Sequence, residues 1–217
     1  MLKAEGISKT YPPLQVLRNV DFHVGRGEVV TIEGASGAGK STLLHIVSTL
    51  DEPDEGKVEF NGVDPFSLSS NELALFRNKN IGFVFQYHNL LAEFTALENI
   101  MLPGMIAKQN KTSLKDRATL LMKKLCVSDR AHHKPSELSG GEAQRVAVAR
   151  ALINSPNIVF ADEPSGNLDS TNAALLHQLF IDMRNEFGHT FVIVTHNSDF
   201  AALGDRRLMM RDGRFEF

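Results

Sequence analysis

A glycine-rich segment, Gly34-Ala35-Ser36-Gly37-Ala38-Gly39-Lys40-Ser41, constrains the fold of this chain more than any other feature. It matches the pattern G-x-x-x-x-G-K-[ST], it follows the apolar stretch Val29 to Glu33, and helical spacing of apolar residues begins at Lys40. Glycines allow backbone N–H groups to curve around phosphate oxygens, and a following helix adds partial positive charge at its N-terminus. The segment therefore predicts a phosphate-binding loop between a strand and a helix. A chance match in an ordinary turn is the alternative, and the flanking strand and helix argue against it.

Two side chains of this loop have specific chemistry. Lys40 is long enough to reach the β- and γ-phosphates of a nucleotide, and the Ser41 hydroxyl is a ligand for Mg²⁺. The residues expected to bind the nucleotide here are Gly34, Ser36, Gly37, Ala38, Gly39, Lys40, Ser41 and Thr42.

A second segment indicates what happens to the nucleotide. The continuous apolar run Ile158 to Ala161 is typical of a strand buried on both faces, and it leads directly into Asp162 and Glu163. Asp162 is placed to hold Mg²⁺, directly or through water, and Glu163 to accept a proton from an attacking water. A solvated acidic pair at a strand end is the alternative, which the phosphate loop makes less attractive.

A second helix start also has the character of an anion site. Leu138-Ser139-Gly140-Gly141-Glu142 precedes an amphipathic stretch, Ala143 to Ile153. Ser139 is a good helix cap, and the glycines expose N–H groups, so a plain cap and an anion site both remain open. One nucleotide cannot easily use both helix starts of one chain, whereas two copies arranged head-to-tail would each lend this loop to the other.

Composition excludes several classes of protein. The chain has 217 residues, of which 42% are hydrophobic and 23% charged, and this apolar content rules out a disordered chain. The net charge of −3 gives no support to a nucleic-acid binder. The longest apolar runs fall far short of a membrane span. Cys126, the single cysteine, is expected to be a small core residue.

The distribution of strand and helix patterns predicts an α/β fold with a mostly parallel sheet. Residues 1–88 and 156–217 carry the strand patterns and form the predicted nucleotide-binding core of a single domain, 1–217. Residues 89–155 lack strand patterns and form the predicted helical lobe, in which Thr95 and Glu98 fit a capping box and Leu114, Leu121 and Leu125 share one helix side.

Taken in order, these motifs closely resemble the ATP-binding-cassette (ABC) ATPase subunits of transporters over essentially the whole chain. GASGAGKST looks like the Walker A loop, LSGGEAQRVAVARAL like the family signature, and IVFADEP like Walker B with its catalytic glutamate. Ser165 to Asp169 resembles the D-loop, Thr195-His196 the switch histidine, Gln86 the Q-loop glutamine and Tyr11 the aromatic residue that stacks on adenine.

The resemblance implies a P-loop ATPase core with an N-terminal antiparallel β subdomain and an inserted helical subdomain. It also implies ATP and Mg²⁺, hydrolysis to ADP and phosphate, and a head-to-tail homodimer that sandwiches ATP. Glu163 would polarise the water, His196 would hold the γ-phosphate, and Gln86 would touch Mg²⁺ or water. The residues expected to complete the site of the other copy are Ser139, Gly140, Gly141, Glu142 and Asp169.

Structural readings of single residues stay open beside these roles. His196 and Gln86 each follow a strand, where a polar side chain is often structural. Tyr11 is also placed to pack on a nearby proline such as Pro12, and Asp169 to start a helix before Ser170.

Within the family, Phe85 to Leu91 followed by Phe94 to Ile100 looks most like the ATPases of lipoprotein-releasing systems of Gram-negative bacteria. The alternatives are the ATPases of macrolide-type efflux and cell-division complexes, or a soluble non-transport ATPase. The resemblance implies a peripheral subunit at the cytoplasmic face of the inner membrane, which binds integral membrane subunits and touches neither cargo nor nucleic acid. Residues of the segment Phe85 to Leu102 would line the groove for a helix of the membrane subunit, or would simply pack the helical lobe.

Overall fold

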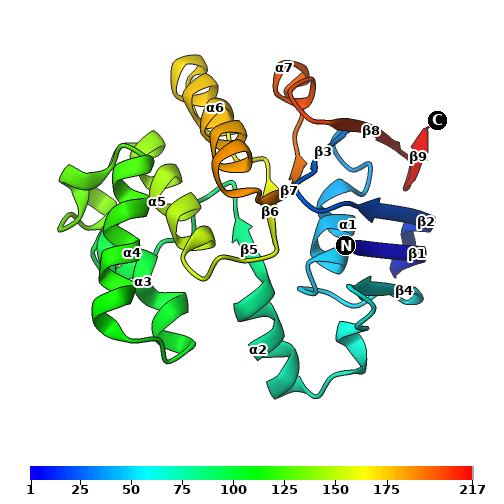
Figure 1. The fold of residues 1–217 in the computed structure, drawn as a ribbon. Helices are drawn as coiled ribbons and strands as arrows, with labels where there is room; N and C mark the ends of the chain where they lie inside the picture. Colours follow the sequence, from blue (N-terminus) through cyan, green and yellow to red (C-terminus); the bar gives the residue numbers. More distant parts are fainter. Residues whose placement is uncertain (217) are drawn as a thin grey trace.

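The computed structural model describes residues 1–216, which form two sheets and two groups of helices (Figure 1). One sheet is three-stranded and antiparallel, with the order β2-β1-β4. Its strands are β1 (Leu2–Tyr11), β2 (Leu14–Val24) and β4 (Glu55–Phe60). The alternation of Val20, Phe22 and Val24, all buried, explains why β2 turns one face toward the core.

The second sheet is six-stranded, with the order β5-β6-β7-β3-β8-β9, and is parallel except for the β8–β9 pair. Its strands are β3 (Val29–Glu33), β5 (Ile81–Val84), β6 (Ile158–Asp162), β7 (Thr190–Val194), β8 (Arg206–Arg211) and β9 (Arg214–Glu216). Every residue of β3 and β7 is buried, as expected for central parallel strands, and their sequences are apolar apart from Thr31, Glu33 and Thr190.

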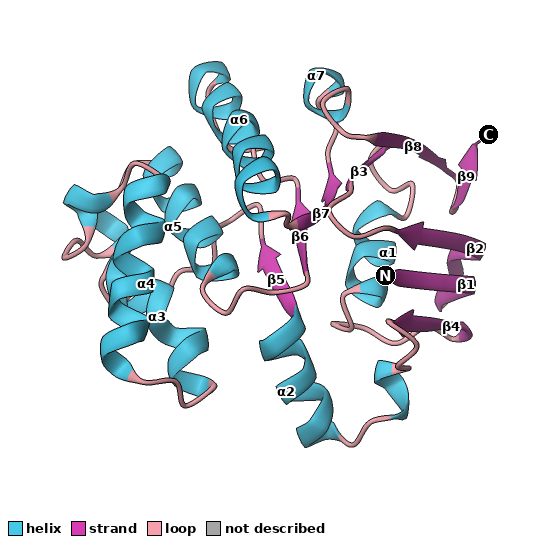
Figure 2. Cartoon of the chain, viewed as in Figure 1, coloured by secondary structure: helices cyan, strands magenta, loops and turns pink. Residues whose placement is uncertain are grey.

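The helices divide between the sheets and a separate bundle (Figures 1 and 2). The α-helices are α1 (Lys40–Val47), α2 (Ser70–Asn80), α3 (Ala96–Ile106), α4 (Lys111–Lys124), α5 (Gly140–Leu152), α6 (Ser170–Phe187) and α7 (Ser198–Ala201). Three short 3₁₀ turns are η1 (Pro65–Ser67), η2 (Ser128–Arg130) and η3 (Pro135–Glu137). Helices α3, α4 and α5 gather at one end of the molecule, beside β5.

The core lies on both faces of the six-stranded sheet, because neighbouring residues of a strand point to opposite faces. Along β6, Ile158 and Phe160 join the cluster that packs α1 between the two sheets. Val159 and Ala161 join the other cluster, which packs α6 and the helical bundle.

The predicted fold class is confirmed, and so are most of the predicted elements. The Thr95–Glu98 capping box begins α3, and Gly188 ends α6 in the left-handed conformation with a φ of 66°. Leu114, Leu121 and Leu125 are all buried. The division of the chain at residues 88 and 156 stays a prediction. Between residues 1 and 216, no helix is long and apolar enough to cross a membrane.

Cys126 corrects one expectation. It is exposed rather than buried, and it has a φ of 55° in the turn after α4. Its neighbours Leu125 and Val127 are the buried residues of this segment. The chain reverses at Cys126, so its side chain points away from the core that both neighbours enter.

Candidate nucleotide site

The glycine-rich loop connects β3 to α1, and close packing fixes its path. Gly39 is the N-cap of α1 with a φ of 101°, and a Cβ there would lie 2.9 Å from Leu17 Cδ2. A Cβ at Gly34 would lie 2.1 Å from the Met210 carbonyl oxygen. A side chain at either position would push the loop away from β2 or β8, so both positions need glycine.

Lys40 lies within the curve of this loop. Its Nζ donates hydrogen bonds to the carbonyl oxygens of Gly34, at 2.9 Å, and Ala35, at 3.0 Å. These carbonyls hold the ammonium group above the loop at the start of α1, where the helix dipole also favours an anion. The arrangement concentrates positive charge at the point where a phosphate group would bind.

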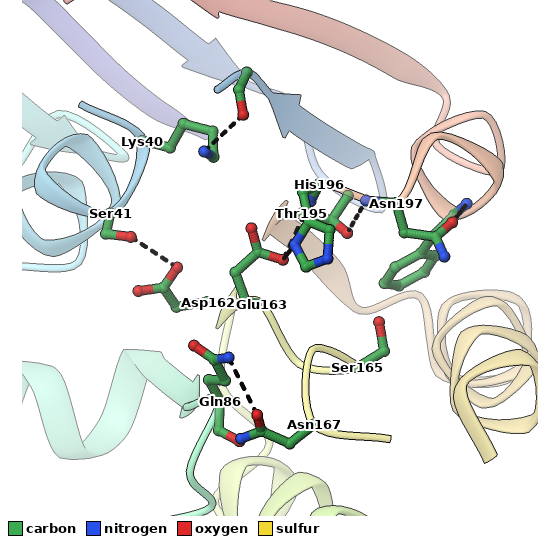
Figure 3. Close-up of polar contacts among 12 residues, drawn as sticks. Lys40, Ser41, Gln86, Asp162, Glu163, Ser165, Asn167, Thr195, His196 and Asn197 are labelled. Atoms are coloured by element: carbon green, nitrogen blue, oxygen red, sulfur yellow. Dashed lines mark hydrogen bonds and ion pairs between the residues drawn. The ribbon is translucent and has the colours of Figure 1, made fainter. Parts of the chain in front are cut away.

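The end of β6 brings a carboxylate to the first turn of α1 (Figure 3). Ser41 Oγ donates a hydrogen bond to Asp162 Oδ1 at 3.0 Å, and His45 Nε2 lies 3.9 Å from Asp162 Oδ2. Burial raises the pKa of Asp162, while the hydrogen bond from Ser41 and the charges of His45 and Lys40 oppose that rise. A partly desolvated carboxylate beside a hydroxyl offers the oxygen ligands that a hard cation such as Mg²⁺ prefers.

Glu163 and His196 form a pair because β6 and β7 are neighbouring parallel strands (Figure 3). Glu163 Oε2 accepts hydrogen bonds from His196 N at 3.1 Å and from His196 Nδ1 at 2.8 Å. A carboxylate only accepts, so Nδ1 carries the proton in this contact. The Glu163 side chain is 17% exposed and that of His196 is 67% exposed, so the imidazole covers the carboxylate. The backbone of Glu163 has a φ of 46°, a conformation that is uncommon for residues other than glycine.

Gln86 follows β5, which pairs with β6, and it reaches the loop that follows Glu163. Its Nε2 lies 3.4 Å from Asn167 Oδ1, and Asn167 Nδ2 donates to the Gln86 carbonyl at 3.1 Å (Figure 3). A Cβ at Gly166 would lie 2.9 Å from Gln86 Nε2, so glycine permits this close approach.

These elements enclose a cavity of about 510 Å³. Its lining contains these residues that the sequence predicts for nucleotide binding or catalysis: Gly34, Ser36, Gly37, Gly39, Lys40, Ser41, Thr42, Gln86, Glu163 and His196. Leu14 and Val16 of β2 complete the lining and were not predicted. Leu14 is 60% exposed despite its apolar side chain. This exposure is the feature that marks it as a possible lining residue, and only the structure provides it.

Tyr11 does not line this cavity. Its hydroxyl donates a hydrogen bond to the carboxylate of Asp51, and Lys9 Nζ lies 5.4 Å from the centroid of its ring. Tyr11 is 47% exposed, and a short turn of the chain separates it from Leu14. Stacking of Tyr11 on adenine stays a prediction.

The residues predicted to act on a second nucleotide form a separate cluster at the start of α5. Ser139 caps the helix, and its N–H donates to Glu142 Oε2 at 2.7 Å in a reciprocal capping box. Arg130 Nε donates to Glu142 Oε1 at 2.7 Å. The Ser139 N–H and the Arg130 guanidinium together lower the pKa of Glu142 to about 2.

The same cluster includes the start of α6. Asp169 is the N-cap of that helix, and its carboxylate accepts from Asn172 N at 2.9 Å. A Cβ at Gly141 would lie 2.6 Å from Asn172 Oδ1, so the two helix starts touch. None of the residues predicted to act on a second nucleotide lines the cavity, namely Ser139, Gly140, Gly141, Glu142 and Asp169. Within one copy of the chain, Asp169 therefore serves as a helix cap.

Known proteins resemble this chain in sequence and in fold. Residues 17–166 match the family model described as ABC transporter. The "Lipoprotein-releasing system ATP-binding protein LolD" of Cytophaga hutchinsonii is 56% identical, and the alignment covers 98% of this chain and 97% of that protein. The protein of the same name from Bacteroides thetaiotaomicron is 55% identical, with 98% of each chain covered.

Solved structures agree with these relatives. A dimeric bacterial ABC transporter cassette superimposes with a TM-score of 0.92 at 41% identity, covering 100% of this chain and 97% of that one. A dimeric post-hydrolysis state of such a cassette, bound to ADP and phosphate, also superimposes with a TM-score of 0.92. By its motifs, its fold and its full-length similarity to these proteins, the chain belongs to the ABC transporter family of ATPases.

Proposed function

We propose that this chain is the ATP-hydrolysing subunit that powers a separate membrane subunit in the release of lipoproteins from the inner membrane. The observation that carries the proposal is the identity of 51–56% with lipoprotein-releasing ATP-binding proteins along 98–100% of the chain. The cavity formed by the glycine-rich loop, Gln86, Glu163 and His196 supports the chemical part of the proposal.

ATP is the substrate, and its phosphates bind in the loop from Gly34 to Thr42. Lys40 exchanges its two carbonyl partners for phosphate oxygens, and the N–H groups at the start of α1 add further donors. Ser41 and Asp162 would hold Mg²⁺, which neutralises charge on the β- and γ-phosphate oxygens. Gln86 also lines the cavity, where it would contact the cation or the attacking water.

Glu163 is the general base. It accepts a proton from the attacking water, and its low exposure keeps the carboxylate away from bulk solvent. His196 holds the γ-phosphate with the imidazole that now covers Glu163. Loss of the phosphate returns His196 to Glu163, which couples product release to opening of the site.

The second cluster acts in a head-to-tail homodimer. Ser139 to Glu142 begin a helix whose exposed N–H groups and glycines suit an anion, yet no nucleotide of the same copy reaches them. In the dimer, this helix start and Asp169 complete the γ-phosphate site of the other copy.

An apolar groove is the proposed docking site for the membrane subunit. It has a volume of about 460 Å³ and lies between α2, α3 and the end of α5, with Phe83, Phe85, Pro103, Ile106 and Ala151 among its lining residues. Ile106 is 60% exposed and Leu75, next to the groove, is 64% exposed. Exposed apolar residues around a groove are typical of an interaction site. Docking there places the chain at the cytoplasmic face of the inner membrane.

Depletion of the chain in its native host tests the biological part of the proposal. Outer-membrane lipoproteins are expected to accumulate in the inner-membrane fraction of a density gradient. A wild-type copy should restore their distribution, and a Lys40→Ala copy should not. Lys111→Ala, which changes an exposed lysine at the start of α4, is the matched control and should restore it as well as wild type.

Normal lipoprotein distribution after depletion would contradict lipoprotein release. If drug sensitivity or septum formation changed instead, the efflux or cell-division alternative would replace it, and the ATPase chemistry would stand.

A further inference from the structure

His177 is a buried titratable residue to which the proposed mechanism assigns no role. It lies on the inner face of α6 among Ala173, Leu176, Phe180 and Met183, and only 6% of it is exposed. An imidazole in an apolar row loses its hydration, and this cost is offset only where the ring finds a hydrogen-bonding partner. Its contacts therefore indicate why a histidine stands there.

The ring makes two contacts. Nε2 lies 2.9 Å from Ser165 Oγ, within hydrogen-bonding distance. The ring also stacks on Phe200, with centroids 3.6 Å apart and planes at 8°. Burial lowers the pKa of His177 to about 4, against a small opposing effect of Asp199. At neutral pH the ring is therefore uncharged, which suits a stack in an apolar layer.

The two partners belong to the two loops that carry the catalytic pair. Ser165 lies in the turn after Glu163, and this turn is closed by a hydrogen bond of 3.0 Å from Gly166 N to the Glu163 carbonyl. Phe200 lies in α7, and its N–H donates to Asn197 Oδ1 at 2.9 Å, directly after His196. Figure 3 shows Ser165 and Asn197 on the two loops that flank the Glu163–His196 pair.

A closed path of contacts results. Glu163 and His196 touch at 2.8 Å at one end, and Ser165, His177 and Phe200 join the same two loops at the other end. The strands that carry these loops, β6 and β7, are paired, and Glu163 N also donates to the Val194 carbonyl at 2.9 Å, so the His177 contacts form a second connection between the loops. Displacement of either loop would therefore disturb the His177 contacts together with the distance between Glu163 and His196.

We propose that His177 is a positioning residue for ATP hydrolysis, which couples the loop after Glu163 to α7 through its hydrogen bond to Ser165. The inference rests on the proposed function, since it assumes that Glu163 and His196 act on ATP. We expect substitution of His177 to affect the chemical step and to leave ATP binding unchanged. The reason is that His177 does not itself contact the residues that line the nucleotide cavity and is connected to them only through the two loops.

A double-mutant cycle on the full-length protein tests the coupling. His177→Phe keeps a ring to stack on Phe200 and removes the hydrogen bond, and Ser165→Ala removes the other partner. Each single variant should lower kcat about tenfold, since small misplacements of catalytic groups cost up to about a hundredfold. The KM for ATP should stay within about twofold of wild type, and the double variant should be no slower than the slower single variant.

Two further variants separate positioning from folding. His177→Gln places an amide nitrogen near the position of Nε2 and should recover most of the lost kcat. His189→Phe is the matched control, because His189 is also a partly buried histidine with a lowered pKa beside aromatic rings, and it precedes β7, whereas the loop of His196 follows the other end of that strand. It should leave kcat unchanged. Thermal unfolding of each variant verifies that it is folded.

Multiplicative effects in the double variant, a change confined to KM, or failure of His177→Gln to recover kcat would overturn the inference. A wild-type kcat for His177→Phe would overturn the inference as well. In each of these cases the proposed function would still stand, provided that the wild-type protein hydrolyses ATP. An inactive wild-type protein, or a Glu163→Gln variant as active as wild type, would instead contradict the proposed function itself.

Discussion

At the scale of single residues, the phosphate loop is built from a few simple groups. Its function depends on backbone N–H groups, a helix start and one lysine, and a local sequence pattern specifies all three. The structure places Lys40 on the carbonyls of Gly34 and Ala35, so its charge lies inside the loop before any phosphate arrives.

Lys40→Ala should weaken the binding of a fluorescent ATP analogue at least about tenfold, because a hydrogen bond to a charged group contributes about 1.5–3 kcal/mol. Titration at fixed ionic strength measures the affinity. Lys111→Ala serves as the control, since it removes the same charge at a site remote from the loop in sequence and outside the cavity lining. Undiminished binding by Lys40→Ala would refute the assignment of the loop.

The strand residues that line the cavity, Leu14 and Val16, are not predictable from a local pattern as the loop is. The adenine-stacking role of Tyr11 rests on the resemblance alone and stays a prediction. Which strand residue faces the loop depends on the turn between β1 and β2 and on how the antiparallel sheet packs on α1. These are contacts between distant segments, and no local pattern encodes them.

At the scale of elements, helices with an apolar stripe were predictable and elements without one were not. The Thr95–Glu98 box and the Ser139 cap marked the starts of α3 and α5. Helix α2 has no buried residue, so its sequence shows no apolar periodicity. β8 has no alternation of polar and apolar residues, and only Met210 of the strand is buried, so its strand pattern is weak.

The start of α5 gives a prediction for stability. Glu142→Ala should lower the free energy of unfolding by about 1 kcal/mol at pH 7, because the variant loses the capping contact with Ser139. The pKa of Glu142 is about 2 in the folded state, below its usual 4.5. Its contribution is therefore complete above about pH 4.5 and is lost as the pH falls toward 2.

Urea unfolding of both proteins between pH 7 and pH 3 measures this difference. The difference in the free energy of unfolding between wild type and Glu142→Ala should decrease as the pH falls. Glu72→Ala is the control, since Glu72 forms the capping box of α2 without an arginine partner, and its effect should be smaller. A gap that stays constant down to pH 3 would contradict the assigned role of Glu142.

At the scale of the whole molecule, the nucleotide cavity and the apolar groove meet at one short segment after β5. Phe85 lines the groove, while its neighbour Gln86 lines the cavity. An occupant of the groove therefore contacts the segment that carries a residue of the nucleotide site.

Ile106→Glu tests the groove. The charge should prevent burial of this surface, so the chain should no longer co-fractionate with inner membranes, while the ATPase rate of the purified chain stays within about twofold of wild type. Leu203→Glu provides the control, because Leu203 is 50% exposed and lies outside the groove. Unchanged membrane association of Ile106→Glu would rule out this docking site.

Glu163→Gln separates ATP binding from ATP hydrolysis. The amide keeps the size of the side chain and cannot accept the proton of the attacking water, so ATP should bind without being cleaved. Light scattering of the purified variant should show a monomer without nucleotide and a stable dimer with ATP, and phosphate release should fall at least about a hundredfold. A variant that stays monomeric with ATP, or that hydrolyses it at the wild-type rate, would contradict the account.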